Sequence, residues 1–547
     1  MKGKIVKSAL LLVLTGKLFM MTASVGASEN SLQSATEWQT PPEEVRQVLH
    51  APPLPQVWTA PTGEVLLLVD PVLYPPLAEL AAPTHKLAGI QVDPATNGRQ
   101  GRYGGTSPRL LRVADGVTTP IHLPTDAELL NVRWTADGQR FALVVRHTDH
   151  IGLWVGPVEG DVAKIEGLAL NPLLGNAASW LPDQQRLLVR RIPQRGPVPE
   201  PPVIPVGPGI LESIGGSARS TYDARNTLET AYDEALFEYY TTSELAIVDP
   251  ETHSIEVMGE PAPYTTARFS PSGDYLLVEW LVAPWSREVA WWRFASEVEV
   301  WNATGDRIAT IASLPVADEV PVRGVPLGPR SVSWRATAPH TLFWTEALDG
   351  GDPSAQVPHR DQLMRLDAPF TADPQVIFKA EHRIRSGWGW SAEGDTLMLI
   401  QHERERRWVY AWLLDVEEGT SRLWFDLDEN DRYGNPGYPL FRILPNGRYV
   451  MHQQGDAVYF RGRGATEEGD RPFLDLRHLE TGETERLFRS DPHRHENFVT
   501  FAGEENRFVL RSESAVEVPN YYLVTLGEEI EAPEGEASRT LTREQLT

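Results

Sequence analysis

The sequence predicts an all-β protein, a seven- or eight-bladed β-propeller of four-stranded blades with short helical insertions. A hairpin-like unit recurs along most of the chain, and radial closure would protect the strand edges that many separate small sheets leave open. The 547 residues exceed the size at which one compact core stops growing, which favours a repeat architecture or several domains. The 45 Pro and 43 Gly fall between apolar runs, as expected for many turns. An array of β-sandwiches is the alternative.

Each copy of the unit has an apolar residue, any residue, an aromatic residue, a polar turn and then four or five mostly apolar residues. Asp-Gly, Ser-Gly and Asn-Gly in these turns supply the positive φ that hairpins require. The copies are VWTAPTGEVLLLVD at 57, VRWTADGQRFALVV at 132, SWLPDQQRLLVRR at 179, ARFSPSGDYLLVEW at 267, VSWRATAPHTLFWTEA at 332, GWGWSAEGDTLMLIQ at 387, LFRILPNGRYVMHQ at 440 and VTFAGEENRFVLRS at 499. Their spacing, roughly 45 to 90 residues, fits four strands per unit with insertions.

The N-terminus has the composition of a cleaved bacterial-type signal peptide over residues 1–27, and an uncleaved anchor is the alternative. Lysines precede an apolar run, and Val25-Gly26-Ala27 supplies small residues for cleavage before Ser28. We assign residues 28–55 to an N-terminal arm, 56–526 to the propeller and 527–547 to a polar C-terminal tail. The export signal predicts a periplasmic or secreted protein.

The arm contains a short predicted helix over residues 41–49. Thr40 is placed to cap it, Pro41 suits the first helical position, and Val45, Val48 and Leu49 form an apolar stripe.

Two insertions interrupt the repeat, at residues 71–108 and 194–242. The second begins with the proline-rich RGPVPEPPVIPVGPG and continues into TLETAYDEALFEYYTTSEL, whose helical periodicity runs through Leu228, Ala231, Ala235 and Tyr239. Long insertions on a rigid scaffold often carry function or partner contacts.

Composition excludes several classes of partner. A net charge of −25 argues against a nucleic-acid surface and against binding to anionic lipid, because both need a concentrated cationic face. The absence of cysteine excludes disulfides, thiol catalysis and Cys-ligated zinc. After the signal, no segment has the roughly 20 apolar residues that a membrane span needs. We therefore expect no nucleic-acid partner and no membrane contact beyond the signal.

The motifs with catalytic or metal-binding residue types favour structural interpretations. No G-x-S-x-G is present, and Gly215-Gly216-Ser217-Ala218-Arg219 lacks its final glycine. Asp426, Asp428 and Asn430 have the spacing that begins a calcium-binding loop, but the Gly and the Glu that such a loop needs are missing. The segment that contains His493, His495 and Glu496 is predicted to be an exposed loop. We predict no catalytic residue, metal or cofactor in this chain. The charge run HERERRW at 402 indicates a solvated edge, and Trp134, Trp180, Trp334 and Trp390 occupy matching positions typical of core aromatics.

An ordered set of phrases spans residues 41–526: APPLP at 51, YPPLAELAAPTHKLAGI at 74, PVGPGILESIGG at 205, YDEALFEYYTTSEL at 232, VEVW at 298, WTEALDGGDP at 344, VPHRDQ at 357, GDRPFLDL at 469, TERLFRS at 484 and VPNYYL at 518. Together they resemble the glutamyl endopeptidase branch of the prolyl oligopeptidase family of serine peptidases. The resemblance implies a propeller that limits access to an α/β-hydrolase domain carrying Ser, Asp and His. This sequence continues for only about twenty residues after Leu526, whereas such a domain needs well over about 100.

The resemblance implies that a substrate glutamate would need a cation, because a buried carboxylate must be paired. Arg219, Arg225, Arg287 and Arg293 are the candidate substrate-binding residues if the propeller contributes to that pocket. The alternative is that each pairs with a surface acid.

The leading functional hypothesis is the propeller portion of a secreted glutamyl endopeptidase-like serine peptidase, without its catalytic domain and inactive alone. Its partners would be peptide substrates when joined to a hydrolase domain, which could be a separate chain. The alternative is a stand-alone periplasmic propeller that binds or scaffolds without catalysis. The helix at 41–49 discriminates between them, because in the family this segment is expected to pack beside the hydrolase domain.

Overall fold

The computed structural model describes residues 40–101, 104–203, 207, 225–385, 389–392, 394–533 and 535–546. Residues Met1–Pro52 and Pro53–Thr547 form two separate units. The described helical segments are few: α1 (Glu43–Leu49), α2 (Leu77–Leu80), α3 (Ala231–Thr241) and a 3-10 turn at Trp291–Arg293. Antiparallel strands make up the other elements, so the all-β prediction is confirmed. The predicted signal at 1–27 lies outside the described residues.

Helix α1 starts at Glu43, two residues later than the predicted first helical position at Pro41. Pro42 is the N-cap residue and makes no side-chain hydrogen bond, so the expected capping by Thr40 is wrong. Thr40 precedes the N-cap position by two residues, so its hydroxyl is too far from the first amides of the helix to accept hydrogen bonds from them. Glu43 and Glu44 occupy the first turn, as expected from the helix dipole.

Four-stranded antiparallel arrangements dominate the second unit. One eight-stranded sheet consists of two halves that a single residue pair, Gly105 with Leu129, connects. The strands of its first half are β1 (Gln56–Thr59), β2 (Val65–Pro71), β6 (Gly105–Arg112) and β7 (Thr118–Pro120). Those of its second half are β8 (Glu128–Trp134), β9 (Arg140–Arg146), β10 (Ile151–Pro157) and β11 (Ala163–Lys164).

Three sheets follow in chain order. The next consists of β12 (Ala178–Trp180), β13 (Leu187–Arg191), β14 (Ser243–Asp249) and β15 (Ser254–Ala262). It is followed by β16 (Tyr264–Phe269), β17 (Tyr275–Leu281), β18 (Ser296–Asn302) and β19 (Arg307–Leu314). The third consists of β20 (Arg330–Trp334), β21 (Thr341–Ala347), β22 (Asp361–Asp367) and β23 (Gln375–Ala380).

The last three large sheets are also antiparallel, and the first two of them contain five strands instead of four. The first contains β24 (Arg383–Ile384), β25 (Gly389–Trp390), β26 (Thr396–Glu403), β27 (Trp408–Asp415) and β28 (Thr420–Asp428). The next contains β29 (Tyr438–Pro439), β32 (Gln453–Gln454), β33 (Ala457–Gly462), β36 (Phe473–His478) and β37 (Thr484–Arg489). The last contains β38 (His495–Ala502), β39 (Glu504–Glu513), β40 (Asn520–Glu529) and β41 (Arg539–Gln545).

Three small sheets complete the described strands. They are β3 (His85–Leu87), β4 (Ile90–Asp93) and β5 (Gly98–Arg99); β30 (Phe441–Ile443) and β31 (Tyr449–Met451); and β34 (Ala465–Thr466) with β35 (Gly469–Asp470).

Every predicted copy of the repeat forms an antiparallel hairpin. The pairs are β1 with β2, β8 with β9, β12 with β13, β16 with β17, β20 with β21, β25 with β26, β30 with β31 and β38 with β39. The turn glycines have the positive φ expected of them, for example 69° at Gly138 and 85° at Gly273. The residues of the turns, which are local in sequence, therefore favour these hairpins.

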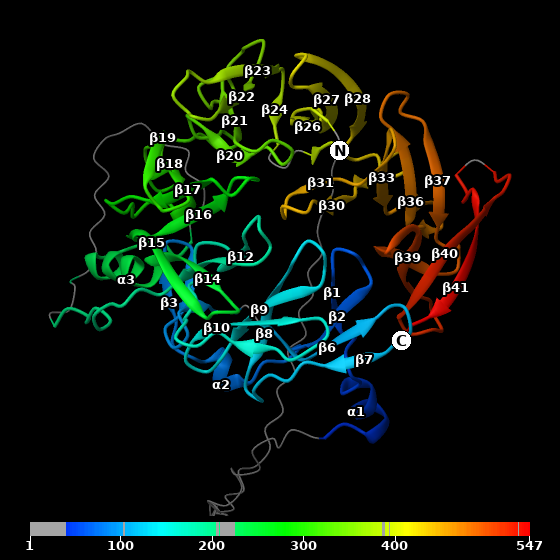
Figure 1. The fold of residues 1–547 in the computed structure, drawn as a ribbon, viewed down its shortest axis with the longest axis horizontal. Helices are drawn as coiled ribbons and strands as arrows, with labels where there is room; N and C mark the ends of the chain where they lie inside the picture. The colour runs from blue at the N-terminus through cyan, green and yellow to red at the C-terminus, as the bar shows by residue number, and fades with distance from the viewer. Residues whose placement is uncertain are drawn as a thin grey trace, which may run out of the picture. The chain divides into compact units, whose positions relative to one another are not determined.

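Hydrophobic clusters lie between sheets that follow one another in the chain, and Figure 1 shows these sheets as neighbours. One further cluster joins the last sheet to the first. In it, Leu66 and Leu111 of the first sheet pack with Val509 and Leu523 of the last. The glycine at 63 lies at this seam, where Gly503 N also donates to Thr62 O at 2.8 Å. Each sheet therefore buries both of its faces against neighbours.

The two predicted insertions pack on each other. Leu87 and Ile90 from the β3–β4 hairpin share a cluster with Leu236, Phe237 and Tyr240 of α3. Asn97 Nδ2 donates to Tyr240 O at 3.2 Å. The helix prediction is confirmed, but its expected apolar face is not: Ala231 and Ala235 are exposed, while Leu236, Phe237 and Tyr240 are buried. The large side chains turn toward the small sheet because they bury more apolar area than alanines do.

The segment assigned to a polar tail completes the last sheet. Strand β41 lies within residues 527–547 and pairs with β40 from Tyr522↔Gln545 to Glu529↔Arg539. The sheet therefore extends beyond the predicted boundary at residue 526. The polar sequence RTLTREQ gave no strand signal because β41 is an outer strand with mostly solvated side chains.

Candidate functional site

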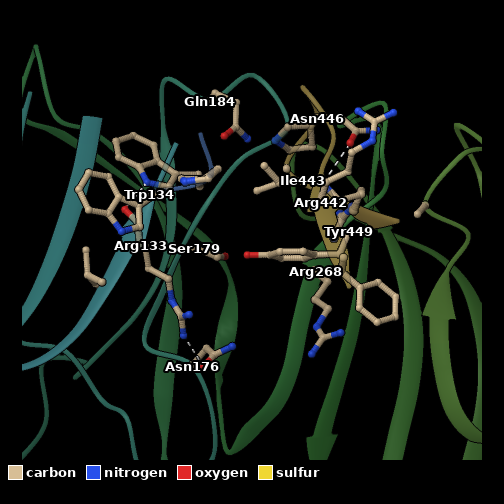
Figure 2. Close-up of a pocket in the computed structure, with 18 of the residues that line it drawn as sticks. Arg133, Trp134, Asn176, Ser179, Gln184, Arg268, Arg442, Ile443, Asn446 and Tyr449 are labelled. Carbon is tan, nitrogen blue, oxygen red and sulfur yellow. Dashed lines mark hydrogen bonds between the residues drawn. The ribbon is translucent and has the colours of Figure 1, made fainter. Parts of the chain in front are cut away.

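One cavity of about 1200 Å³ lies where the first strands of the hairpins meet (Figure 2). Residues from β1, β8, β12, β16, β20, β25, β30 and β38 all line it. These strands are the N-terminal halves of the eight repeat copies. The repeat thus brings corresponding residues of its copies together to line one cavity.

The variable residue of the repeat, between the apolar and the aromatic positions, faces this cavity. The lining residues at that position are Arg133, Ser179, Arg268, Ser333, Arg442 and Thr500. Sequence reasoning did not single them out, because a position occupied by "any residue" looked uninformative. Reading that position down the eight copies is the signal that would have found them.

Arginine dominates the charged groups of the lining. The arginines are Arg99, Arg133, Arg190, Arg268, Arg442, Arg448 and Arg461, and none of the lining residues that the structure describes is Asp or Glu. Several donate to neutral oxygens: Arg133 Nη2 to Asn176 Oδ1 at 2.7 Å, and Arg461 Nη1 to Phe498 O at 3.4 Å. In a chain of net charge −25, this cavity is lined by positive charge.

Two of these arginines carry a desolvation cost. Burial lowers the pKa of Arg190 to about 10, with repulsion from Arg268 adding to the shift and Glu279 opposing it. Burial, and then repulsion from the same Arg268, lowers the pKa of Arg448 to about 10. Both guanidiniums therefore remain protonated at neutral pH, in surroundings that disfavour their charge.

The β30–β31 hairpin reaches into the cavity. Its strands pair with each other instead of joining the β33 sheet. From its turn, Arg448 Nη2 donates to the carbonyl oxygen of Phe269 in β16. Tyr449, 64% exposed, points across the cavity toward Ser179 (Figure 2). This hairpin therefore shapes the space that the other strands enclose.

Two of the repeat tryptophans join neighbouring sheets at the cavity. Trp180 Nε1 donates to Arg133 O and Trp334 Nε1 to Arg268 O, each at 2.8 Å. Trp334 and Trp390 are buried, and Trp134 and Trp180 pack on core clusters, so their prediction as core aromatics is confirmed. All four also line the cavity. The indoles of Trp180 and Trp334 therefore link their own strands to the carbonyl groups of the strands beside them.

Comparison with known proteins identifies homologues of this chain. The chain is 32% identical over 527 residues to "Probable glutamyl endopeptidase, chloroplastic" of Arabidopsis thaliana, and 30% identical over 524 residues to the protein of the same name from Oryza sativa subsp. japonica. These matches cover 90% and 89% of this chain. Over nine-tenths of its length, the chain is a homologue of these glutamyl endopeptidases. It spans about half the length of these relatives, 54% and 55%.

Other comparisons of this glutamyl endopeptidase homologue are weaker. No family model matches. A solved prolyl endopeptidase superposes with a TM-score of 0.42 at 12% identity, covering 89% of this chain and 59% of that one. The β-propeller domain of the Trilobed protease from Pyrococcus furiosus gives 0.38 at 12% identity, covering 77% and 98%. An oligogalacturonate lyase in complex with manganese gives 0.40 at 14%, covering 77% and 96%.

The arginines predicted to bind a substrate glutamate lie elsewhere in this homologue. Arg287 Nε pairs with Glu234 Oε1 at 2.6 Å, and Arg293 Nη1 donates to Ala317 O at 3.3 Å. Arg225 is exposed, and Arg219 lies outside the described residues. None of the three described arginines lines the cavity. Their role in binding substrate stays a prediction.

The remaining motifs serve local structure. Asp426 accepts from Trp408 Nε1 at 2.7 Å, and Asp428 accepts from Asn430 N at 2.8 Å. The turn Arg404–Arg407 is exposed, as expected of a solvated edge. Within the described ranges, no group of three His, Cys, Asp or Glu is placed to hold a metal ion, and no helix has the length and apolarity of a membrane span.

The prediction of an exposed loop at 493–496 is wrong for Glu496. This residue is 1% exposed and lies in β38. Its carboxylate accepts from Ser512 Oγ and from Arg543 Nη2, each at 3.1 Å. Neighbouring His495 is exposed, since alternate residues of a strand face opposite sides.

Proposed function

We propose that residues 56–545 form a closed propeller of eight blades that controls access to the active site of a glutamyl endopeptidase-like serine peptidase. Hydrophobic packing between consecutive sheets, and between the last sheet and the first, supports the closed ring. The eight hairpins that line one cavity support the count of eight. The single observation that carries the function is the match of nine-tenths of this chain to glutamyl endopeptidases.

The role proposed for the ring follows from the size of its cavity. A space of about 1200 Å³ holds an extended peptide segment, whereas a folded domain is far larger. Peptides and unfolded segments would therefore pass or bind, and folded proteins would be kept out. The peptide-bond chemistry would come from a Ser, Asp and His of a hydrolase domain, as in the family.

Residues 28–547 alone are expected not to hydrolyse peptides, because the printed sequence contains no G-x-S-x-G to present a nucleophile. The measurement is release of a fluorophore from a peptide substrate with Glu before the reporter bond. A serine-directed phosphonate, added to a parallel sample, removes any contaminating peptidase. Phosphonate-resistant turnover that scales with the concentration of the chain would contradict the expectation.

The second candidate is a stand-alone propeller that binds without catalysis. Its support is that all the described cavity walls come from this one chain. The two candidates differ at residues 41–50, because a segment that normally packs beside a hydrolase domain should exchange its amide hydrogens quickly when that domain is missing. We expect fast exchange there. Strong protection of these amides in residues 28–547 would favour the stand-alone protein.

We propose export of this chain to the periplasm or the medium through residues 1–27. The curated relatives are named chloroplastic, so their destination differs from the one proposed here. N-terminal sequencing of the mature protein tests the proposal, with Ser28 as the expected first residue. A mature chain that begins at Met1 would overturn it.

A further inference from the structure

The cavity concentrates arginine side chains that the fold itself does not neutralise. Arg268 and Arg442 occupy the same position of two repeat copies and make no side-chain hydrogen bond or ion pair within the described part of the chain. Arg190 and Arg448 lie in the same lining. The propeller therefore holds cationic groups toward an enclosed space, although folding would be served as well by neutral residues.

Arg190 is a buried residue of this lining whose side chain has an unused donor. Its side chain is buried, with only 6% of the residue exposed. Nη2 donates to Thr265 O at 2.7 Å, but Nη1 has no hydrogen-bond partner among the described residues. Arg448 Nε is likewise buried without a partner in that part of the chain. A buried guanidinium with an unused donor costs free energy unless an acceptor is supplied.

The charges also repel one another. Arg268 disfavours the charged forms of both Arg190 and Arg448. The carboxylate acting on this group is Glu279, which accepts from Thr266 Oγ1 and Ser296 Oγ and does not line the cavity. An anion placed among the three arginines would relieve the repulsion, in a setting where charge-assisted hydrogen bonds are strong.

The size and the apolar groups of the cavity indicate what carries the anion. Its volume of about 1200 Å³ is far larger than a single inorganic ion needs. Tyr438, Phe441 and Tyr449 present 73%, 43% and 64% of their surfaces beside the arginines. Carboxylates match the planar fork of a guanidinium, and aromatic faces accept aliphatic or peptide groups. An extended chain with several carboxylates and apolar groups between them fits both features.

We propose that this cavity binds an acidic peptide segment, with its side-chain carboxylates on Arg190, Arg268, Arg442 and Arg448. The proposal rests on the proposed function, which makes peptides the molecules that reach the cavity. It adds that binding takes place within this chain and selects for several negative charges along the segment. The acidic exterior, by contrast, repels such a peptide, so the cavity is where it is held.

The test is direct binding of a fluorescein-labelled, C-terminally amidated peptide of alternating Glu and Ala to the full chain, followed by fluorescence anisotropy. The matched ligand has Gln at every Glu position. We expect saturable binding of the Glu peptide, at least about tenfold weaker binding of the Gln peptide, and marked weakening by salt. Amidation removes the terminal carboxylate, so binding must come from side chains.

Variants of the chain locate the site. The double variant Arg268→Gln, Arg442→Gln should weaken binding of the Glu peptide at least about tenfold. Arg404→Gln, which removes the same kind of charge from an exposed turn, should leave it unchanged. Thermal unfolding by circular dichroism checks that both variants are folded. If Arg268→Gln, Arg442→Gln proves unstable, Tyr449→Ala, which removes an exposed ring from the cavity, provides the second measurement and should weaken binding.

Several results would overturn the proposal. They are equal binding of Glu and Gln peptides, equal weakening by Arg404→Gln, or binding of oligogalacturonate or inorganic phosphate with no binding of the Glu peptide. Failure here is distinguishable from failure of the proposed function. Hydrolysis by residues 28–547 would contradict the latter without affecting peptide binding, and absence of peptide binding would leave the family role of the propeller untouched.

Discussion

Replacing Asp361 with asparagine is expected to lower the free energy of unfolding by about 3 to 5 kcal/mol. Asp361 is fully buried, and its Oδ1 accepts from Arg330 Nη2 and Arg383 Nη1, each at 2.6 Å. Its Oδ2 accepts from Ile384 N at 2.8 Å. The aspartate lies in β22, while Arg383 and Ile384 belong to β24 of the next sheet. The variant would leave the mostly buried guanidinium of Arg330 without its charge partner, and Arg383 would keep only its pair with Asp349 at the junction of the two sheets.

Urea unfolding followed by tryptophan fluorescence measures the effect of Asp361→Asn. Its matched control is Glu234→Gln, which removes the carboxylate partner of the more exposed Arg287. That change should alter stability by less than about 1 kcal/mol, because exposed ion pairs contribute little. Equal effects of the two substitutions would show that the buried pair contributes no more than a surface pair.

Replacing Gly63 with alanine is expected to destabilise the contact between the first and last sheets by about 3 kcal/mol. Gly63 has a φ of 68°, which alanine adopts only with strain. An added Cβ would also lie 1.5 Å from the carbonyl oxygen of Phe501. This residue belongs to β38 of the last sheet, so either the turn or the seam must move. Urea unfolding again gives the measurement.

Gly419→Ala separates the two causes of that loss. Gly419 has a φ of 70°, nearly the same as Gly63, but an added Cβ there meets nothing within 4 Å. It should cost about 1 kcal/mol from backbone strain alone. The difference between the two variants then reports the close contact between the first and last sheets. The same loss of stability in both would mean that the seam relaxes without cost.

The hairpins could be predicted from sequence because each is specified by its own turn and by the alternation of its strands. The outer strands were harder to predict, as β41 shows. Its sequence RTLTREQ is polar, and it forms a strand because its backbone pairs with β40. Helix α3 could also be predicted only in part. Its periodicity predicted a helix, but the burial of Phe237 in place of Ala235 depends on the small β3–β4 sheet, which lies about 140 residues away in sequence.

The candidate site escaped prediction for a different reason. Arg268 and Arg442 are separated by 174 residues, and neither belongs to a recognisable motif. Their convergence is a property of the fold, in which the first strands of the hairpins line one cavity. Arg287 drew attention because it lies in a distinctive stretch of sequence, yet the structure pairs it with Glu234 on α3.

The separation of β30 and β31 from the large sheets has a consequence for the cavity. The inner strands of the other hairpins belong to the ladders of their own large sheets, so displacing them breaks hydrogen bonds of that sheet. The β30–β31 pair is tied to β33 at its base, where Leu440 N donates to Tyr459 O at 2.7 Å, and to β16 at its turn, where Arg448 donates to the carbonyl oxygen of Phe269. Val450 and Met451 of β31 are fully buried and hold the hairpin by packing. On this side, the width of the cavity therefore depends on side-chain contacts of one hairpin and not on the ladder of a large sheet.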